Sequence, residues 1–491
     1  MKKIILLLLI LLTSVAGAMQ VSSQGTPYSF SLQQSIEFAL KSKASLKATR
    51  NEERIAKAKV GEIRAIGLPQ VNASAEVGNN FIQQKTALDP SGFGPQMELQ
   101  PFVISQGDIA SGQDIRLTPT YAAAEQRPNQ PLQIISFVQP YTGSLTVSGS
   151  QLLFDGSYLI GLKAASTYTE LSRKSTIQSE IEIADQVSKA YYSVLVNRSR
   201  MELLNQNLVR LDTLLKQTDI MYKNGVAEKL DVDRLRVSFN NLNVEKQRTE
   251  RLLDLSLSLL KFQMGMLQQE ELELTDQLEE VEVELNKISR DDFNYGGRIE
   301  YSILETQRQL AHLDLRNIRS GYLPKLNLNA RYGYAGFGQT FSDVMNIRAG
   351  HNNVTNRNWF DFGYVGVQLQ VPIFDGLRKS YQIQQAKITL DNTELGFEEL
   401  RQSIDLQLTQ ASTEIINSID VLKSRKENME LAEEIARVAK IKFQEGVGSN
   451  LEVVTAETDL REAQTNYYAA MYDALIAKVN LDKATGTLLA K

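Results

Sequence analysis

Proline is confined to a few short parts of this chain, and its absence elsewhere is the strongest constraint on the fold. The 11 prolines of the 491 residues lie at 27, 69, 90 to 140, 324 and 372. Residues 141–323 and 373–491 therefore contain none. Proline breaks a helix because it lacks the backbone N–H and its ring clashes with the preceding turn. Two such long stretches without proline favour very long, unbroken helices.

The chain also repeats itself. The sequence F-D-G occurs at 154–156 and again at 374–376, an offset of 220 residues. Upstream, GLPQVNASAEVG at 67–78 aligns with YLPKLNLNARYG at 322–333, an offset of 255. Each copy reads as helix, strand, loop, strand, helix, break and helix. We interpret the chain as an internal tandem duplication whose first copy carries 35 extra residues between its two strands.

Four segments show the alternation of a strand, with apolar side chains on one face and polar side chains on the other. In residues 324–334, Leu326, Leu328 and Ala330 alternate with asparagine and lysine. In the first copy, Leu145, Val147 and Leu153 are expected to share one face, although the pattern there is weaker. We predict strands at about 68–78, 144–154, 323–337 and 362–374.

Such strands suit either a soluble sandwich or a transmembrane barrel. A sandwich needs a second apolar layer, whereas strands of about ten residues that are apolar outside and polar inside are typical of a barrel in a membrane. Four strands cannot close, and an open sheet edge is not tolerated in hydrocarbon. Two copies of the chain would supply eight strands and a filled interior, and three would supply 12 and a wet lumen. The polar inner faces favour three copies.

The helical stretches carry apolar residues at steps of three and four, which is the pattern of a coiled-coil seam. We predict helices at about 157–222, 229–267, 377–444 and 450–484. About 66 residues at about 1.5 Å each make a rod of about 100 Å. Rods of that length exceed a compact domain, so we expect them to pack against one another lengthwise.

Two similar breaks interrupt the helices, NGVAEKLDVD at 224–233 and EGVGSNLEVV at 445–454. Each is predicted to be the bend of a helical hairpin. Ser449 and Glu452 fit the S-x-x-E capping box, whose reciprocal hydrogen bonds start a helix. Glu228 stands where Ser449 would be in the first break, so that break is expected to lack the box.

The N-terminus reads as an export signal. MKKIILLLLILLTSVAGAMQ has two lysines, an apolar run and a small-x-small site, which predicts a signal peptide over 1–18 that is cleaved after Ala18. The apolar run is too short for a membrane helix, which needs about 20 residues. We divide the rest into a first repeat at 19–260, an acidic connector at 261–300 and a second repeat at 301–491.

Composition argues against several classes of function. The net charge of −5 and the lack of a basic cluster argue against a nucleic-acid partner. The absence of cysteine excludes disulfides and thiolate metal sites. His312 and His351 have no metal-spaced partner, so we expect no metal, no cofactor and no enzymatic activity. The acidic run at 268–292 lacks the spacing of a calcium loop and is interpreted as a solvated helix end and connector.

These features together resemble the TolC-like outer-membrane efflux channel proteins. The resemblance covers the whole mature chain and rests on the duplication and on the order of its motifs. Those motifs are the L-P-x-[VL]-N entries at 68–72 and 323–327, the F-D-G exits, the two [YF]-x-x-G-x5-[DE]-V breaks and the closing A-T-G-x-L at 484–488.

The resemblance implies an α+β membrane protein and a homotrimer. Its 12-stranded transmembrane β-barrel, four strands per chain, would lie in the lipid of the outer membrane. A long antiparallel α-helical coiled-coil barrel would continue it into the periplasm. The hairpin tips would meet a periplasmic adaptor of the membrane fusion protein class and, through it, an inner-membrane pump of the RND, ABC or MFS type. Such a duct would export small molecules or proteins in a tripartite efflux or type I secretion system.

The resemblance also implies roles for particular residues. The positions that match the family's docking tips are Gly225, Val226, Leu230, Asp231, Gly446, Val447, Leu451 and Glu452. Glu452 further matches the first of two acidic positions that constrict the periplasmic aperture, whereas Thr455 departs from the second. A ring of three Glu452 side chains would be a weak cation filter. The same residue is equally expected to cap its own helix.

A function of another class stays open from the sequence. The chain would also suit a periplasm-spanning structural tether or a surface adhesin that a β-barrel only anchors. The polar strand faces favour the duct, because an anchor has no lumen to line. The first surface loop, at 79–143, holds seven of the 11 prolines and has the length of a functional or disordered loop.

Overall fold

The computed structural model describes residues 28–88, 97–112, 114, 118–123, 132–278, 293–348 and 357–489. The predicted signal peptide and His351 lie outside these residues. The described chain forms two compact units, and each takes segments from both predicted repeats. The sheet unit comprises described residues of 64–158 and 321–373, and the helical unit comprises those of 28–63, 159–320 and 374–489.

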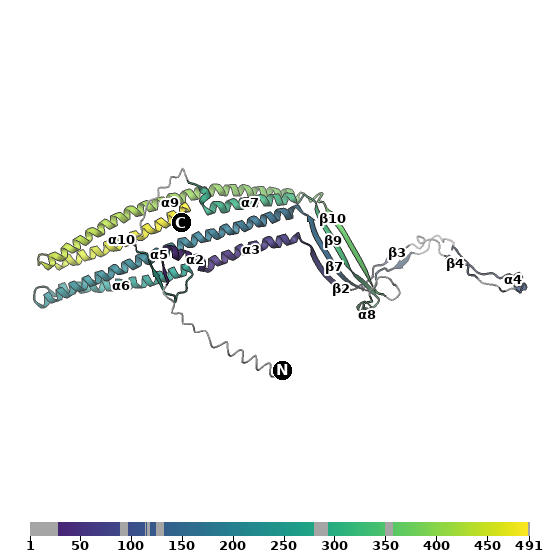
Figure 1. Ribbon diagram of the computed structural model, residues 1–491, viewed down its shortest axis with the longest axis horizontal. Helices are drawn as coiled ribbons and strands as arrows, with labels where there is room; N and C mark the ends of the chain where they lie inside the picture. The colour runs from purple at the N-terminus through teal and green to yellow at the C-terminus, as the bar shows by residue number, and fades with distance from the viewer. Residues whose placement is uncertain are drawn as a thin grey trace, which may run out of the picture. The chain divides into compact units, whose positions relative to one another are not determined.

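The sheet unit is built on one antiparallel sheet of four strands (Figure 1). The strands are β2 (Gln70–Asn79), β7 (Tyr141–Phe154), β9 (Lys325–Gly338) and β10 (Trp359–Gln370). Their order in the sheet is β10-β9-β7-β2, so a strand from the first half of the chain pairs with one from the second half at its centre.

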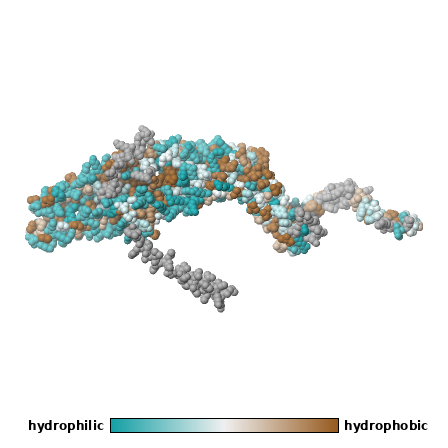
Figure 2. All heavy atoms as spheres, in the orientation of Figure 1, coloured by the Kyte–Doolittle hydropathy of each residue, from teal (hydrophilic) through white to brown (hydrophobic). Residues whose placement is uncertain are grey.

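The register separates the sheet into an apolar and a polar face. Val71 pairs with Gly149, Gly149 with Ala330 and Ala330 with Val365, which makes one row of the apolar face. The next row, on the opposite face, is Asn72, Ser148, Arg331 and Tyr364. Hydrophobic residues gather over β9 and β10 in the space-filling view (Figure 2). This alternation is what the sequence pattern predicted for the strands of the second copy.

Two details of the strands differ from the prediction. The last strand was expected to reach residue 374 and ends at Gln370. Pro372 explains this end, because it has no N–H for the ladder and restricts the residue before it. The register also shifts near the end of β7. An irregularity between Leu152 and Phe154 gives Leu153 no paired residue and pairs Phe154 with Leu326, so Phe154 lies on the same face as Leu145.

The loops beyond the sheet carry short elements. Between β2 and β7, the described residues form two antiparallel pairs and a short helix. These are β3 (Thr86–Leu88) with β6 (Gln133–Ile135), β4 (Met97–Leu99) with β5 (Tyr121–Ala123), and α4 (Gln106–Ala110). The β9–β10 loop forms α8 (Phe341–Met345). Trp359 is buried there, and its indole N–H donates to the Val344 carbonyl at 3.0 Å.

The helical unit consists mainly of two long hairpins that lie side by side (Figure 1). The first is α5 (Gly156–Lys223) with α6 (Lys229–Met264), and the second is α9 (Arg378–Gln444) with α10 (Asn450–Thr485). The shorter helices are α2 (Leu32–Ser42), α3 (Ala44–Ile66), α7 (Ile299–Ser320) and the 3-10 turn η4 (Tyr295–Gly297). Within the described residues, no helix is both long and apolar enough to cross a bilayer.

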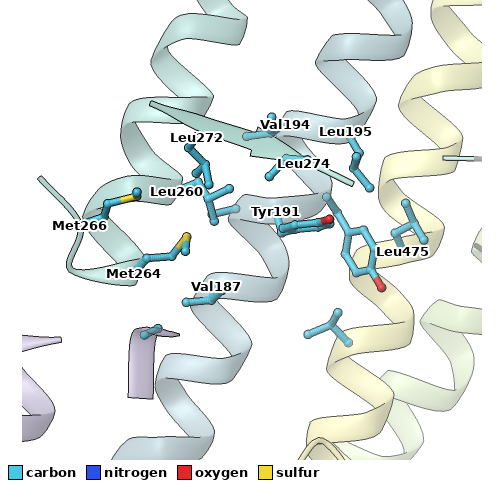
Figure 3. Close-up of a cluster of buried hydrophobic side chains, with 14 of the residues drawn as sticks. Val187, Tyr191, Val194, Leu195, Leu260, Met264, Met266, Leu272, Leu274 and Leu475 are labelled. Atoms are coloured by element: carbon cyan, nitrogen blue, oxygen red, sulfur yellow. The ribbon is translucent and has the colours of Figure 1, made fainter. Parts of the chain in front are cut away.

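The largest hydrophobic cluster lies where α5, α6 and α10 meet a small parallel sheet (Figure 3). That sheet pairs β1 (Tyr28–Phe30) with β8 (Leu272–Leu274). Leu272 and Leu274 are buried against Tyr191 and its neighbours, so this part of the acidic run is not the solvated connector that the charge pattern suggested. The Tyr191 hydroxyl donates to the Asp276 carboxylate at 2.9 Å, and the N–H of Leu32 donates to the same oxygen at 2.9 Å.

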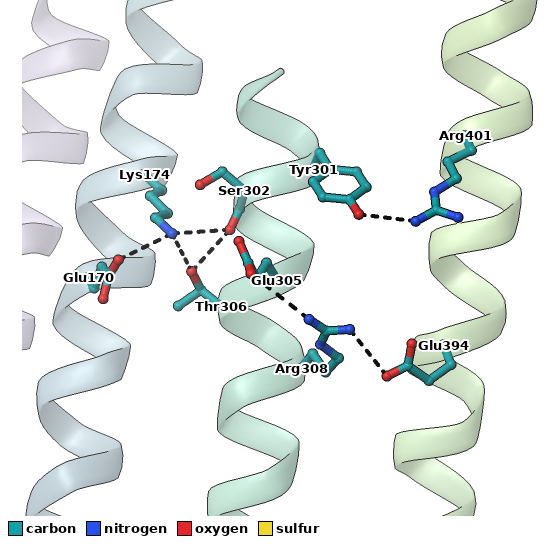
Figure 4. A network of polar contacts seen from close by, with 9 residues as sticks. All are labelled: Glu170, Lys174, Tyr301, Ser302, Glu305, Thr306, Arg308, Glu394 and Arg401. Atoms are coloured by element: carbon teal, nitrogen blue, oxygen red, sulfur yellow. Dashed lines mark hydrogen bonds and ion pairs between the residues drawn. The ribbon is translucent and has the colours of Figure 1, made fainter. Parts of the chain in front are cut away.

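Polar side chains fix α7 between α5 and α9 (Figure 4). The ammonium group of Lys174 on α5 donates to the Thr306 hydroxyl on α7 at 2.7 Å. On the other side, the guanidinium of Arg401 on α9 donates to the Tyr301 hydroxyl at 3.2 Å. The short helix is therefore tied to both hairpins through side chains that sequence periodicity does not reveal.

Candidate functional site: the two hairpin tips

The backbone of both tips follows the same left-handed helix ending. Gly225 has φ +77° and Gly446 has φ +71°, a region that L-residues with a side chain rarely adopt. The next N–H turns back onto the helix, because Val226 donates to the Met221 carbonyl at 2.9 Å and Val447 to the Lys442 carbonyl at 3.0 Å. This is the Schellman ending that satisfies the last carbonyl groups of a helix.

The start of each second helix is capped by side chains. At the second tip, the Ser449 hydroxyl accepts from the N–H of Glu452 at 3.2 Å, which is one half of the predicted capping box. The first tip was expected to lack such a box, and the Glu228 side chain makes no cap hydrogen bond there, but the other half of the box is present. There the Asp231 carboxylate accepts from the N–H of Glu228 at 3.3 Å, because a glutamate at the cap position still leaves its backbone N–H to be satisfied.

Apolar side chains at both tips point into solvent. Val226 is 71% exposed and Leu230 is 52% exposed. The equivalent positions of the second tip, Val447 and Leu451, are 79% and 54% exposed. Paired exposure of this kind at two equivalent bends is typical of an interaction surface rather than of an isolated surface residue.

Behind the tips, the two hairpins share one hydrophobic core. It draws Leu214 from α5, Leu235 from α6, Phe443 from α9 and Val453 from α10, all of them buried. Because all four helices contribute, neither hairpin can move without disturbing side chains of the other.

The sequence did not indicate the polar contacts that join the hairpins across this core. Asn450 is buried, and its side-chain amide donates to the Asp231 carbonyl at 2.9 Å and to the Asp231 carboxylate at 3.2 Å. Farther along, the Asn207 amide donates to the buried side chain of Gln464 at 2.8 Å. Arg210 forms an ion pair with Glu457 at 3.1 Å.

The structure thus brings one predicted tip residue, Asp231, into direct contact with the other tip. The tip glycines and the four apolar tip residues lie on the outside of the two bends. Glu452 is exposed in the first turn of α10, and Thr455 is exposed one turn later. Among the described residues, no group of three or more histidine, aspartate or glutamate side chains could hold a metal ion.

Comparison with known proteins identifies the family. The profile of the family described as outer membrane efflux protein matches residues 136–261 and 303–487, which is more than half of the chain. The outer membrane protein TolC of Vibrio cholerae is 21% identical over 353 residues, which cover 70% of this chain and 77% of that protein. The toluene efflux pump outer membrane protein TtgC of Pseudomonas putida is 23% identical over 357 residues, or 70% of this chain and 69% of that protein.

Solved structures show the same fold. The crystal structure of a membrane protein from Pseudomonas aeruginosa superposes with a TM-score of 0.66 at 18% identity and covers 92% of each chain. The chain therefore belongs to the outer membrane efflux protein family, and the predicted resemblance and location in the outer membrane are confirmed. The family is one of efflux channels and not of enzymes.

Proposed function

We propose that three copies of this chain form an exit duct, with a 12-stranded barrel in the outer membrane and a helical tunnel in the periplasm. The observation that carries the proposal is the four-stranded sheet with one apolar face. Within the described residues its edge strands are β2 and β10, and the outer edge of each has no strand paired to it. An unpaired edge in hydrocarbon leaves backbone N–H and carbonyl groups without partners, so the sheet requires further strands.

The long hairpins support the same assembly. Apolar residues of α6, Val237 and Val244, lie seven residues apart and are exposed. On α9, Leu431, Ile435 and Val438 follow steps of four and three and are also exposed. Each is a coiled-coil seam that the chain itself leaves uncovered. Because the two seams lie on different helices, contact between α6 of one copy and α9 of the next would be head to tail and could close a ring.

The tips are the proposed docking surface for a periplasmic adaptor, which links the duct to an inner-membrane pump. Each tip exposes one valine and one leucine to solvent, so the two tips have equivalent apolar surfaces. The glycines adopt the positive φ that these bends require. Helical hairpins of an adaptor are suitable partners, since apolar side chains on one helical bend fit between those of another.

Opening of the duct is proposed to depend on the link between the hairpins. In the ring of three chains, Glu452 would line the narrow periplasmic end, while it also favours the positive end of α10. Adaptor contact at the tips would let the α9–α10 hairpin swing away from α5–α6. That movement breaks the contact of Asn450 with Asp231 and the ion pair of Arg210 with Glu457.

Single-channel recording in planar bilayers tests the proposal. The purified full-length mature protein should insert and pass current in discrete steps of one size. A protein that inserts as a trimer and passes no current, whatever the voltage or added adaptor, would instead support a tether or adhesin that a barrel only anchors.

A further inference from the structure

The polar face of the sheet carries one arginine with an unusual setting. Arg331 lies on β9. Its row across the sheet also contains Asn72 of β2, Ser148 of β7 and Tyr364 of β10. These side chains line a shallow concavity on that face, together with Ser150 and Asn329. Hydroxyl and amide groups therefore surround the guanidinium, and no carboxylate is among the residues that line the concavity.

The guanidinium is supported by an aromatic ring. Its central carbon lies 5.2 Å from the ring centroid of Tyr364 on β10, which is within the range of a cation–π contact. Gly366 makes room for this ring, because a Cβ at that position would collide with the Tyr364 hydroxyl. Within the described chain, Arg331 forms no ion pair with an acidic side chain, so its charge is not neutralised.

Few other charges share this face of the sheet. Lys325 lies on it but forms an ion pair with Asp155 at 2.8 Å. Glu76 lies on the same face four residue pairs farther along the sheet, in the row of Ser144 and Ala335. Arg331 and Glu76 are therefore the two charges of the central polar face that have no salt-bridge partner among the described residues.

We propose that Arg331 makes the barrel lumen select for anions and gives a passing anionic group a place to bind. This inference rests on the proposed function, because it requires the polar face to line a lumen that three copies enclose. Eight-stranded barrels are filled by side chains and 16-stranded barrels leave a wide channel. A 12-stranded lumen lies between them, so a side chain as long as arginine projects well toward its centre.

The chemistry of the row defines the ligand class. Arginine offers a planar fork of N–H donors that fits carboxylate, sulfonate and phosphate groups. The Ser148 hydroxyl and the Asn72 amide, in the same row, add neutral donors. Because water fills the lumen, each contact is weak and reversible, which suits passage rather than retention.

Ion selectivity of the mature protein in planar bilayers tests the proposal, with potassium chloride as the probe. Reversal potentials across a salt gradient would be measured for the wild type, Arg331→Gln, Arg331→Lys and Glu76→Gln. Each protein would also be made with the additional substitution Glu452→Ala, so that charge at the periplasmic end does not dominate the measured ion selectivity. Three charges about 10 Å from the axis should change the chloride-to-potassium permeability ratio by about threefold near 0.1 M salt.

The expected result is a roughly threefold lower ratio for Arg331→Gln and a ratio close to the wild-type value for Arg331→Lys. Glu76→Gln is the matched control on the same face, and it should move the ratio in the opposite direction. Near 1 M salt the differences should vanish, because the screening length falls to about 3 Å.

A failure of the anion-selective role of Arg331 can be distinguished from a failure of the proposed duct. If the wild type conducts and Arg331→Gln leaves the ratio unchanged in the Glu452→Ala background, Arg331 does not select anions, although the duct survives. An Arg331→Lys protein that behaves like Arg331→Gln would also reject the role of charge. If no variant and no wild-type protein conducts, the proposed duct itself fails.

Discussion

Replacing Asn450 with alanine should loosen the link between the two hairpin tips. The Asn450 amide is buried and donates to both the carbonyl and the carboxylate of Asp231, on the opposite hairpin. Alanine has a higher helix propensity than asparagine, so it does not weaken α10 itself, and it removes both donors. The Arg210 ion pair stays in place in this variant, so the tips should loosen without separating fully.

The magnitude follows from the two hydrogen bonds. A hydrogen bond to a charged group contributes about 1.5–3 kcal/mol when buried. Asp231 is only partly buried, and water can replace a lost donor, so about 1 kcal/mol per chain is a suitable value. If three chains open together, about 3 kcal/mol is lost from the closed state, which is roughly a hundredfold change in the ratio of closed to open channels.

Single-channel recording without adaptor is the assay. The Asn450→Ala protein should spend a larger fraction of time in its high-conductance state than the wild type does. Ser449→Ala is the matched control, because it removes the helix cap at a cost of about 1 kcal/mol, and the hydrogen bond that is lost lies within α10 and its cap. If Asn450→Ala opens no more often than the wild type, or if Ser449→Ala opens the channel to the same extent, the contact of Asn450 with Asp231 does not hold the tips closed.

Five further substitutions have defined outcomes. Glu452→Ala should raise conductance or lower the cation preference of the open channel, and an unchanged record would leave stabilisation of the positive end of α10 as its role. Gly446→Val and Gly225→Val each force a β-branched residue to positive φ, so adaptor-dependent export should fall more than trimer yield. Equal losses of export and trimer yield would remove the support for docking at the tips. Val244→Asp places a charge in the exposed α6 seam and should shift detergent-extracted protein from trimer toward monomer, as light scattering would report. Burial, with help from Asp482 and Asp276, raises the pKa of Tyr192 to about 12. The folded state therefore loses about 2–3 kcal/mol of stability as pH rises from about 10 through about 12, and Tyr192→Phe should flatten this part of an alkaline unfolding curve.

The helices and strands could be predicted from the sequence wherever the local residue pattern agrees with the tertiary structure. The proline-free stretches hold the long helices, and the alternation of Val365 and Val367 with glycine and glutamine matches the two faces of β10. The two glycine-led breaks lie at the helix ends, since positive φ is needed there and glycine supplies it.

The remaining features depend on contacts between residues far apart in the chain. Asn450 reads as a solvated residue after a helix cap, and only its pairing with Asp231, 219 residues earlier, gives it a role. Leu272 and Leu274 alternate with glutamates, so the run looks solvated until β1 covers it. The irregularity at Leu152 was hidden because three consecutive apolar residues, Leu152 to Phe154, fit either face equally well.

The mass of the native assembly shows directly whether three chains form the duct. Native mass spectrometry of the full-length protein, extracted from outer membranes into detergent, should find three chains per particle. Because α6 of one copy is proposed to contact α9 of the next, the particle should still contain three chains after dilution. A particle of one or two chains would contradict the proposed trimer, because it could not supply the 12 strands of a closed barrel with a wet lumen.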